Sequence, residues 1–196
     1  LHYAVCHEIG HNLLYARGLT RLRAPSLATP ETIALVSQVS TSTAHPLVAQ
    51  ALESLGLPIL GHEARRGERF LRSLLSRRSR LAPAQAALIA AEFTTTLGLG
   101  WLRGAQRALE SFDPRAAHLA HDLYPLIEQC SHGVAQTEDA RRWIIHELTG
   151  APGVAGVNPL QRAPGPRPRQ APTPAKAGTW RLSPPTAGSQ PVPGKT

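Results

Sequence analysis

His7-Glu8-Ile9-Gly10-His11, near the beginning of this 196-residue chain, spells the pattern HExxH. On an α-helix, residues i and i+4 lie on the same face, so His7 and His11 can both direct an imidazole nitrogen at one metal ion while Glu8 projects beside them. The pattern is typical of a zinc site that carries its own general base. Apolar residues surround the motif and Gly18 suits a helix end, so we predict a helix over roughly residues 2–17. A helix whose histidines only form hydrogen bonds is the alternative interpretation.

A hydrolytic zinc centre needs a third protein ligand, which leaves one coordination position for water. The extended pattern HExxHxxGxxH would require glycine and histidine where the chain has Leu14 and Arg17, so this ligand comes from farther along the chain. The candidates are Glu31, His45, Glu53, His62 and Glu63. Glu31 is the first choice because Thr29-Pro30-Glu31 predicts the start of a second helix, and His45 is the second choice. Glu31 could equally be an acid that stabilises the first turn of that helix.

The motif and its surroundings resemble a known family. The segment from His7 to Leu14, followed after a short loop by Glu31-Thr32-Ile33-Ala34, is similar to the zincin metallopeptidase-like domains of the ImmA/IrrE type, the small gluzincins of bacteria. The resemblance implies that His7, His11 and Glu31 bind Zn²⁺, that Glu8 is the catalytic base, and that the reaction is peptide hydrolysis. It covers about residues 2–48, and Leu35 stands where the family usually has asparagine.

Domains of this type usually place the strands of a small sheet before the metal-binding helix, and the edge strand of that sheet binds an extended peptide by main-chain pairing. Such strands are absent before His7, and the chain begins at Leu1 and contains no methionine. We therefore expect an N-terminally truncated fragment of a longer protein.

The region after Glu31 is predicted to be helical almost throughout, because its apolar residues recur at helical spacing between prolines and glycines. The predicted helices span residues 30–43, 46–56, 63–78, 83–97, 99–110, 114–130 and 137–149. No segment has the pattern of a strand, so the expected fold class is mainly α. We expect no membrane span, because the alanine-rich segment 82–97 is too short and contains Glu92. The chain divides into a zincin-like metal-binding segment at 1–60, a helical region packed on it at 61–150, and a tail at 151–196.

The positive charge is concentrated in the tail. Residues 1–150 contain 15 arginines, no lysine and 13 acidic residues, which leaves +2 of the total net charge of +8. Residues 151–196 contain basic residues, no acid and 11 of the 18 prolines, so we expect this Pro/Arg-rich tail to be disordered. Nucleic-acid binding by the tail or by the arginine-rich helix at 65–80 is a further hypothesis. A solvated helix face and a solubilising extension are the alternatives.

The other histidines and the cysteines give weaker indications. His118, His121, Cys130 and His132 are close together in the sequence and could form a second metal site, although their spacing matches no zinc pattern. Cys6 and Cys130 are the only cysteines and form no CxxC pair, which favours a reducing, cytoplasmic environment without a disulfide.

The sequence as a whole predicts a zinc-dependent metallopeptidase that acts on a peptide or protein substrate. Zn²⁺ would be held by His7, His11 and Glu31, and Glu8 would take a proton from the attacking water. The alternative is a non-catalytic helical domain for regulation or protein interaction, in which the metal site is structural or vestigial.

Overall fold

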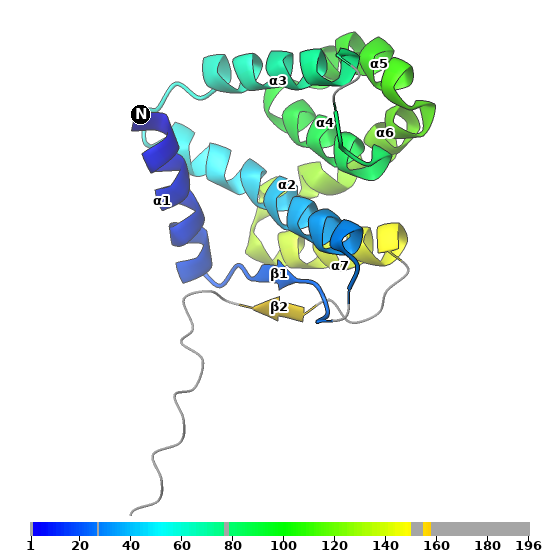
Figure 1. The fold of residues 1–196 in the computed structure, drawn as a ribbon. Helices are drawn as coiled ribbons and strands as arrows, with labels where there is room; N and C mark the ends of the chain where they lie inside the picture. Colours follow the sequence, from blue (N-terminus) through cyan, green and yellow to red (C-terminus); the bar gives the residue numbers. More distant parts are fainter. Residues whose placement is uncertain (1, 27, 77–78, 150–154, 158–196) are drawn as a thin grey trace, which may run out of the picture. The chain divides into compact units, whose positions relative to one another are not determined.

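The computed structural model describes residues 2–26, 28–76, 79–149 and 155–157 (Figure 1). These residues form a mainly helical fold, as the sequence predicts. The helices are α1 (His2–Ala16), α2 (Pro30–Ser54), α3 (Leu60–Leu75), α4 (Pro83–Leu97), α5 (Leu99–Phe112), α6 (Pro114–Gln129) and α7 (Val134–Thr149), with a short 3-10 turn at Cys130–His132. All of the described residues belong to one compact unit. Within the described residues, no helix combines the length and apolar content that crossing a bilayer requires.

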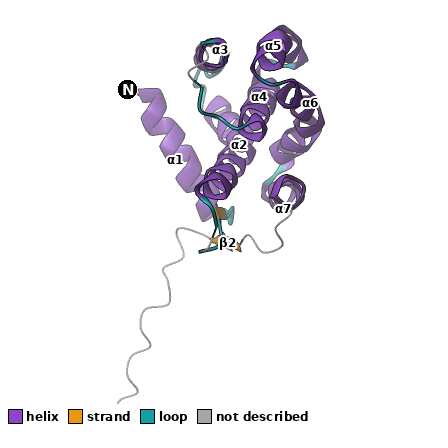
Figure 2. Cartoon of the chain, turned by 45° about the vertical axis from the view of Figure 1, so that its right-hand side comes forward, coloured by secondary structure: helices purple, strands orange, loops and turns teal. Residues whose placement is uncertain are grey.

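α4 lies at the centre of the main core. It contacts α2, α3, α5 and α6, which are grouped around it in Figure 2. Four alanines of α4 are fully buried (Ala86, Ala87, Ala90 and Ala91), and such small side chains allow neighbouring helices to approach closely. Leucines and isoleucines of α5, α6 and α7 fill the remaining space: Leu102, Leu109, Leu123, Ile127 and Ile144.

α1 packs on α2 through a second, smaller core formed by Leu14, Leu19, Ala44, Val48, Leu52 and Ile59. The two helices approach closely at Gly10, where an added Cβ atom would lie 2.9 Å from Cγ1 of Val48. Glycine is therefore required for this approach, because any side chain there would push α1 away from α2. α1 ends at Ala16, and Gly18 follows with a φ of +98°, which agrees with the helix end predicted near this glycine.

α2 is a single helix of 25 residues that continues through Pro46. The prediction of two helices, at 30–43 and 46–56, is therefore wrong. Proline removes one main-chain hydrogen bond from a helix, but buried side chains on both sides of Pro46, including Val39 and Leu52, pack into the two cores and hold the helix together. The other predicted helices are confirmed, with ends displaced by at most three residues.

Two short strands, β1 (Arg21–Arg23) and β2 (Ala155–Val157), pair in antiparallel register, with Leu22 opposite Gly156. The prediction that the chain has no strand is wrong, because three-residue strands are too short to show an alternating pattern. The main-chain N–H of Leu22 also donates to Oγ of Ser40 on α2, over 3.2 Å. The tail predicted to be disordered begins at residue 151, but residues 155–157 within it form β2, so the prediction is wrong for these residues because pairing with β1 orders them. The rest of the predicted tail lies outside the described residues.

Arg141 of α7 ties the last helix to α2 and to the loop before β1. Arg141 is fully buried (0% exposed). The guanidinium donates to Oγ1 of Thr43 over 2.7 Å, to the carbonyl of Ser40 over 2.9 Å and to the carbonyl of Thr20 over 2.5 Å. Glu138 pairs with the same guanidinium at 3.1 Å. Arg141 thus fixes the position of the loop that leads into β1.

Candidate metal centre

His7 and His11 of α1 meet His45 of α2 where the two helices cross. Each of the three side chains offers a ring nitrogen, and these nitrogens all lie within 4.8 Å of one another. The Nε2 atoms of His7 and His45 are 3.1 Å apart. The close packing of Gly10 against Val48 brings the two helices near enough for this cluster to form.

Two features of His7 and His11 suit a metal ion: their pKa values are lowered, and one buried ring nitrogen has no hydrogen-bond partner among the described residues. Burial, together with His45 and His7, lowers the pKa of His11 to about 4. Burial and the neighbouring His45 and Arg66 also lower the pKa of His7. Nδ1 of His11 is buried and has no hydrogen-bond partner within the described residues. Three imidazoles form a donor set that Zn²⁺ readily accepts, so the residues fit this metal.

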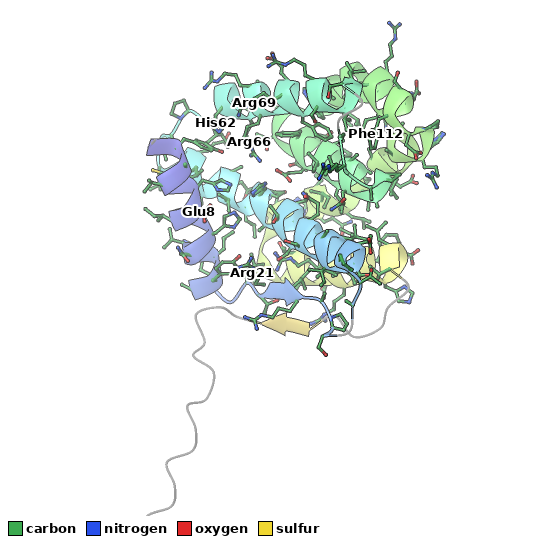
Figure 3. The ribbon with its side chains drawn as sticks, in the orientation of Figure 1. Glu8, Arg21, His62, Arg66, Arg69 and Phe112 are labelled. Atoms are coloured by element: carbon green, nitrogen blue, oxygen red, sulfur yellow. The ribbon has the colours of Figure 1, made fainter. Side chains whose placement is uncertain are left out.

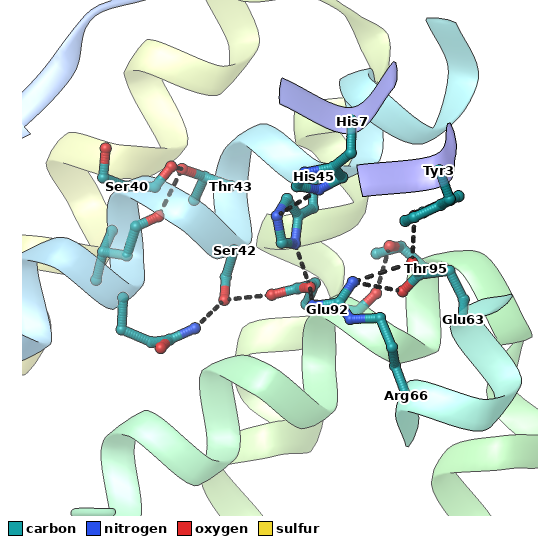
Figure 4. Close-up of polar contacts among 12 residues, drawn as sticks. Tyr3, His7, Ser40, Ser42, Thr43, His45, Glu63, Arg66, Glu92 and Thr95 are labelled. Atoms are coloured by element: carbon teal, nitrogen blue, oxygen red, sulfur yellow. Dashed lines mark hydrogen bonds and ion pairs between the residues drawn. The ribbon is translucent and has the colours of Figure 1, made fainter. Parts of the chain in front are cut away.

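His45 is held by a buried carboxylate on the side away from His7. Its Nδ1 atom is hydrogen-bonded to Oε1 of Glu92 on α4, and Figure 4 shows this contact. Glu92 is only 4% exposed and also accepts a hydrogen bond from Oγ of Ser42, over 2.8 Å. Burial opposes the charged form of Glu92, but His45, Arg66 and Ser42 together hold its pKa below the usual value. A carboxylate in this position fixes the orientation and tautomer of a ligand histidine.

A second layer of polar contacts connects this pair to α1 and α3 (Figure 4). Arg66 of α3 lies 3.9 Å from Glu92 and donates to Glu63 over 2.9 Å. The hydroxyl of Tyr3 donates to Glu63 over 2.6 Å, and its ring stacks on His62 with centroids 3.5 Å apart. Burial and the Glu63 carboxylate raise the pKa of Tyr3, so the hydroxyl remains a donor. His62 and Glu63, two of the candidate third ligands, thus have contacts outside the cluster.

The structure does not bring Glu31 to the histidines. Glu31 is exposed in the first turn of α2, where its own main-chain N–H and Thr29 lower its pKa. It precedes His45 by 14 residues of the same helix, which corresponds to about 21 Å along the helix axis. Glu53, another candidate, is exposed near the other end of α2 and faces a different cleft. His45 alone among the candidates lies beside His7 and His11.

An open cleft of about 420 Å³ gives access to the cluster. All three histidines line it, together with Glu8, Asn12 and Tyr15 of α1 and Arg21 of β1. Figure 3 shows Glu8 on α1 and Arg21 below it, at the start of β1. The side chain of Glu8 is 76% exposed, and its Oε1 atom lies 3.6 Å from Nδ1 of His7. The Glu8 carboxylate and the three histidines therefore line the same solvent-accessible cleft.

The second metal site considered from the sequence is not assembled. Within the described residues, the histidine cluster formed by His7, His11 and His45 is the only group of three potential ligands close enough to share an ion. Cys130 is fully buried, and its Sγ atom faces the carbonyl of Leu126 at 3.4 Å. Burial raises the pKa of the Cys130 thiol to about 11, which makes it a poor metal ligand at neutral pH.

Sequence reasoning did not identify Glu92 as part of the site. The available signal is a single acidic residue in an otherwise apolar, alanine-rich segment. A lone acid in such a setting must find a buried partner, because an unpaired charge in a core is strongly unfavourable. The sequence does not say which residue that partner is.

No family model, no curated protein and no solved structure matches this chain. The resemblance of residues 2–48 to ImmA/IrrE-type domains therefore stays a prediction. What the chain can do chemically follows from the histidine cluster, its carboxylates and its cleft.

Proposed function

We propose that this chain is a zinc-dependent peptidase in which His7, His11 and His45 hold Zn²⁺ and Glu8 is the general base. The observation that carries the proposal is the convergence of three imidazole nitrogens within 4.8 Å beside the HExxH glutamate in an open cleft. Three protein ligands leave a coordination position for water or substrate, which is the arrangement of catalytic zinc sites.

The chemistry divides between the metal and the protein. Zn²⁺ bound by the cluster would polarise a substrate carbonyl and lower the pKa of a water molecule. The Glu8 carboxylate takes a proton at Oε1 or Oε2 during the attack and returns it to the leaving amine. Its exposure on the cleft wall leaves it free to approach a substrate.

The contact between His45 and Glu92 supports the metal site. When Nδ1–H of His45 donates to Glu92, the Nε2 lone pair is left for the metal. Nε2 is also the atom that faces His7, at 3.1 Å. The tautomer that Glu92 favours is therefore the one that a metal ligand requires.

The proposed ligand set differs from the one that the family resemblance implies. Three histidines replace the two histidines and one glutamate of a gluzincin, because His45 stands beside the motif and Glu31 is exposed about 21 Å away along α2. We therefore propose a zincin-like HExxH helix with a different third ligand.

A structural metal site is the second candidate. Its support is the position of the cluster between α1 and α2, where an ion would crosslink the two helices. In that case Zn²⁺ would stabilise the fold and Glu8 would have no chemical role. A catalytic role of Glu8 is expected for the peptidase and not for the structural zinc site, so the effect of changing Glu8 distinguishes the two proposals.

The test combines zinc content with peptide cleavage. We expect about one zinc per chain in the wild type, loss of zinc in His45→Ala, and retention in Glu31→Ala, a matched change in the same helix. Glu8→Gln should keep the zinc but lower peptide turnover at least about a hundredfold. Turnover unaffected by Glu8→Gln would support the structural site, and zinc lost through Glu31→Ala but kept in His45→Ala would contradict the proposed ligand set.

A further inference from the structure

A second cleft adjoins the cleft at the histidine cluster. The second cleft has a volume of about 430 Å³ and is lined by β1, the loop after it, and the first turns of α2. Arg21, Leu22 and Ser37 line both clefts. The two clefts are therefore neighbours along α2, and we call them together the α2 groove.

A regular row of α2 side chains forms the floor of the α2 groove. Ile33, Ser37, Thr41 and His45 follow one another at intervals of four residues, and each lines one or both clefts. Side chains with this spacing lie on one face of a helix. From Ile33 to His45 the groove runs about 18 Å along the helix axis, which is enough for roughly five residues of an extended peptide.

Basic side chains from β1 form one wall. Arg21 and Arg23 are exposed on the same face of the strand, whereas Leu22 between them is buried. Glu8 is the single acid among the described residues that line either cleft. No ion pair links Arg21 or Arg23 to another described residue. Their charges are thus available to a ligand.

The main chain of β1 is already engaged. The N–H of Leu22 donates to Ser40, and Arg21 and Arg23 stand in register with Val157 and Ala155 of β2. A peptide in the groove therefore cannot pair with β1 as an added strand. Side chains must therefore recognise the ligand, and Arg21 and Arg23 are the charged groups of β1 that can select it.

We propose that the α2 groove binds an extended peptide with acidic side chains next to the scissile bond, selected by Arg21 and Arg23. This inference rests on the proposed peptidase function, because it places the scissile bond at the histidine cluster. Beyond the arginines, the exposed side chain of Ile33 with Val36 and Pro25 offers an apolar contact for a residue farther along the peptide. The substrate class is an anionic, partly apolar peptide segment.

Peptide binding tests the inference separately from catalysis. The probes are two pools of labelled peptides with mixed sequences. Each peptide has about eight residues, which is longer than the groove. The two pools differ only at chosen positions, where one has glutamate and the other has glutamine. Fluorescence anisotropy measures their binding to zinc-loaded Glu8→Gln protein, which prevents turnover during the measurement. We expect the glutamate pool to bind roughly fivefold more tightly at low salt, as two exposed ion pairs would give.

Matched variants test whether Arg21 and Arg23 cause the preference for the glutamate pool. Arg21→Gln/Arg23→Gln should remove it, whereas Arg103→Gln/Arg107→Gln, which changes the charge equally on exposed positions of α5, should keep it. Equal binding of both pools, or a preference that survives loss of Arg21 and Arg23, would overturn the inference. Displacement of the peptide by a single-stranded oligonucleotide of much higher affinity would also overturn it, in favour of a nucleic-acid site.

Turnover of both pools by the wild type then tests the proposed function. Selective binding of the glutamate pool without cleavage of either pool would refute the proposed peptidase function but would still support peptide binding in the α2 groove. Cleavage of both pools at equal rates would refute the proposed selection of acidic peptides by the α2 groove but would still support the peptidase function.

Discussion

Nδ1 of His45 on α2 is hydrogen-bonded to Oε1 of Glu92 on α4, a residue 47 positions later in the chain. The main core and the histidine cluster therefore share one buried carboxylate. Changes in α4, which lines neither the metal cleft nor the α2 groove, can alter the cluster through this contact.

Glu92→Gln should weaken zinc binding about 10- to 100-fold, the usual effect of losing a carboxylate behind a histidine ligand. The amide still fills the space, but its neutral oxygen is a weaker acceptor for Nδ1–H of His45, and its NH2 group favours the opposite tautomer when it faces the ring. Chelator competition measures the affinity, and far-UV circular dichroism verifies the helices. Glu110→Gln is the matched control because Glu110 is exposed and bonds only to Gln106. Equal zinc affinity in wild type and Glu92→Gln would remove the proposed role of Glu92.

Gly10→Ala should separate α1 from α2, because its Cβ would lie 2.9 Å from Cγ1 of Val48. We expect a loss of about 1–3 kcal/mol in the free energy of unfolding, as overpacking usually causes, together with weaker zinc binding. Gly104→Ala, at a helical position with open space around it, should instead stabilise the protein by up to about 1 kcal/mol. Urea unfolding measures both. Partial rescue of Gly10→Ala by Val48→Ala would identify the clash as the cause, and no change in Gly10→Ala would contradict it.

Arg141→Met should lower the free energy of unfolding by about 3 kcal/mol or more, because it removes the hydrogen bonds of a buried guanidinium to Thr43 and to the carbonyls of Thr20 and Ser40, and its ion pair with Glu138. Arg142, the next residue, is 79% exposed, and Arg142→Met should change stability by less than about 0.5 kcal/mol. Thermal and urea unfolding of the two variants give the comparison. Similar stabilities for both would show that the buried guanidinium is dispensable.

Cys130 should react far more slowly with iodoacetamide than Cys6. Burial raises the pKa of Cys130 to about 11, so at pH 8 only about one thiol in a thousand is ionised. The thiolate is the reactive form, and its fraction grows as the pH rises toward the raised pKa. Cys6 is partly exposed and serves as the internal reference in peptide mapping by mass spectrometry. Equal labelling of both residues in the folded protein would show that the α6 end opens readily.

The sequence predicts local structure here better than it predicts contacts between helices. The HExxH helix and most of the later helices follow from apolar spacing, prolines and glycines, which act over a few residues. The third ligand depends instead on where α2 crosses α1. A helix break is expected at Pro46, so the predicted helices end next to His45, where the cluster forms. Glu31 is preferred as the third ligand in the sequence because it lies in the first turn of a predicted helix.

The role of β1 could not be predicted for a related reason. Its three residues form a strand because residues 155–157 pair with them and Ser40 accepts a main-chain N–H bond. Neither partner is a neighbour in the sequence. Short elements of this kind are defined by tertiary contacts more than by residue propensity.

Arg141 bonds to Thr43 across 98 positions of the chain. Contacts between residues so far apart form slowly, because a long loop must close before the contact can stabilise anything. The individual helices can therefore form before the loop leading into β1 is fixed and before α1 docks on α2. The loop that leads into β1, and with it the place of Arg21 at the cleft, is therefore fixed only when α7 has packed on α2.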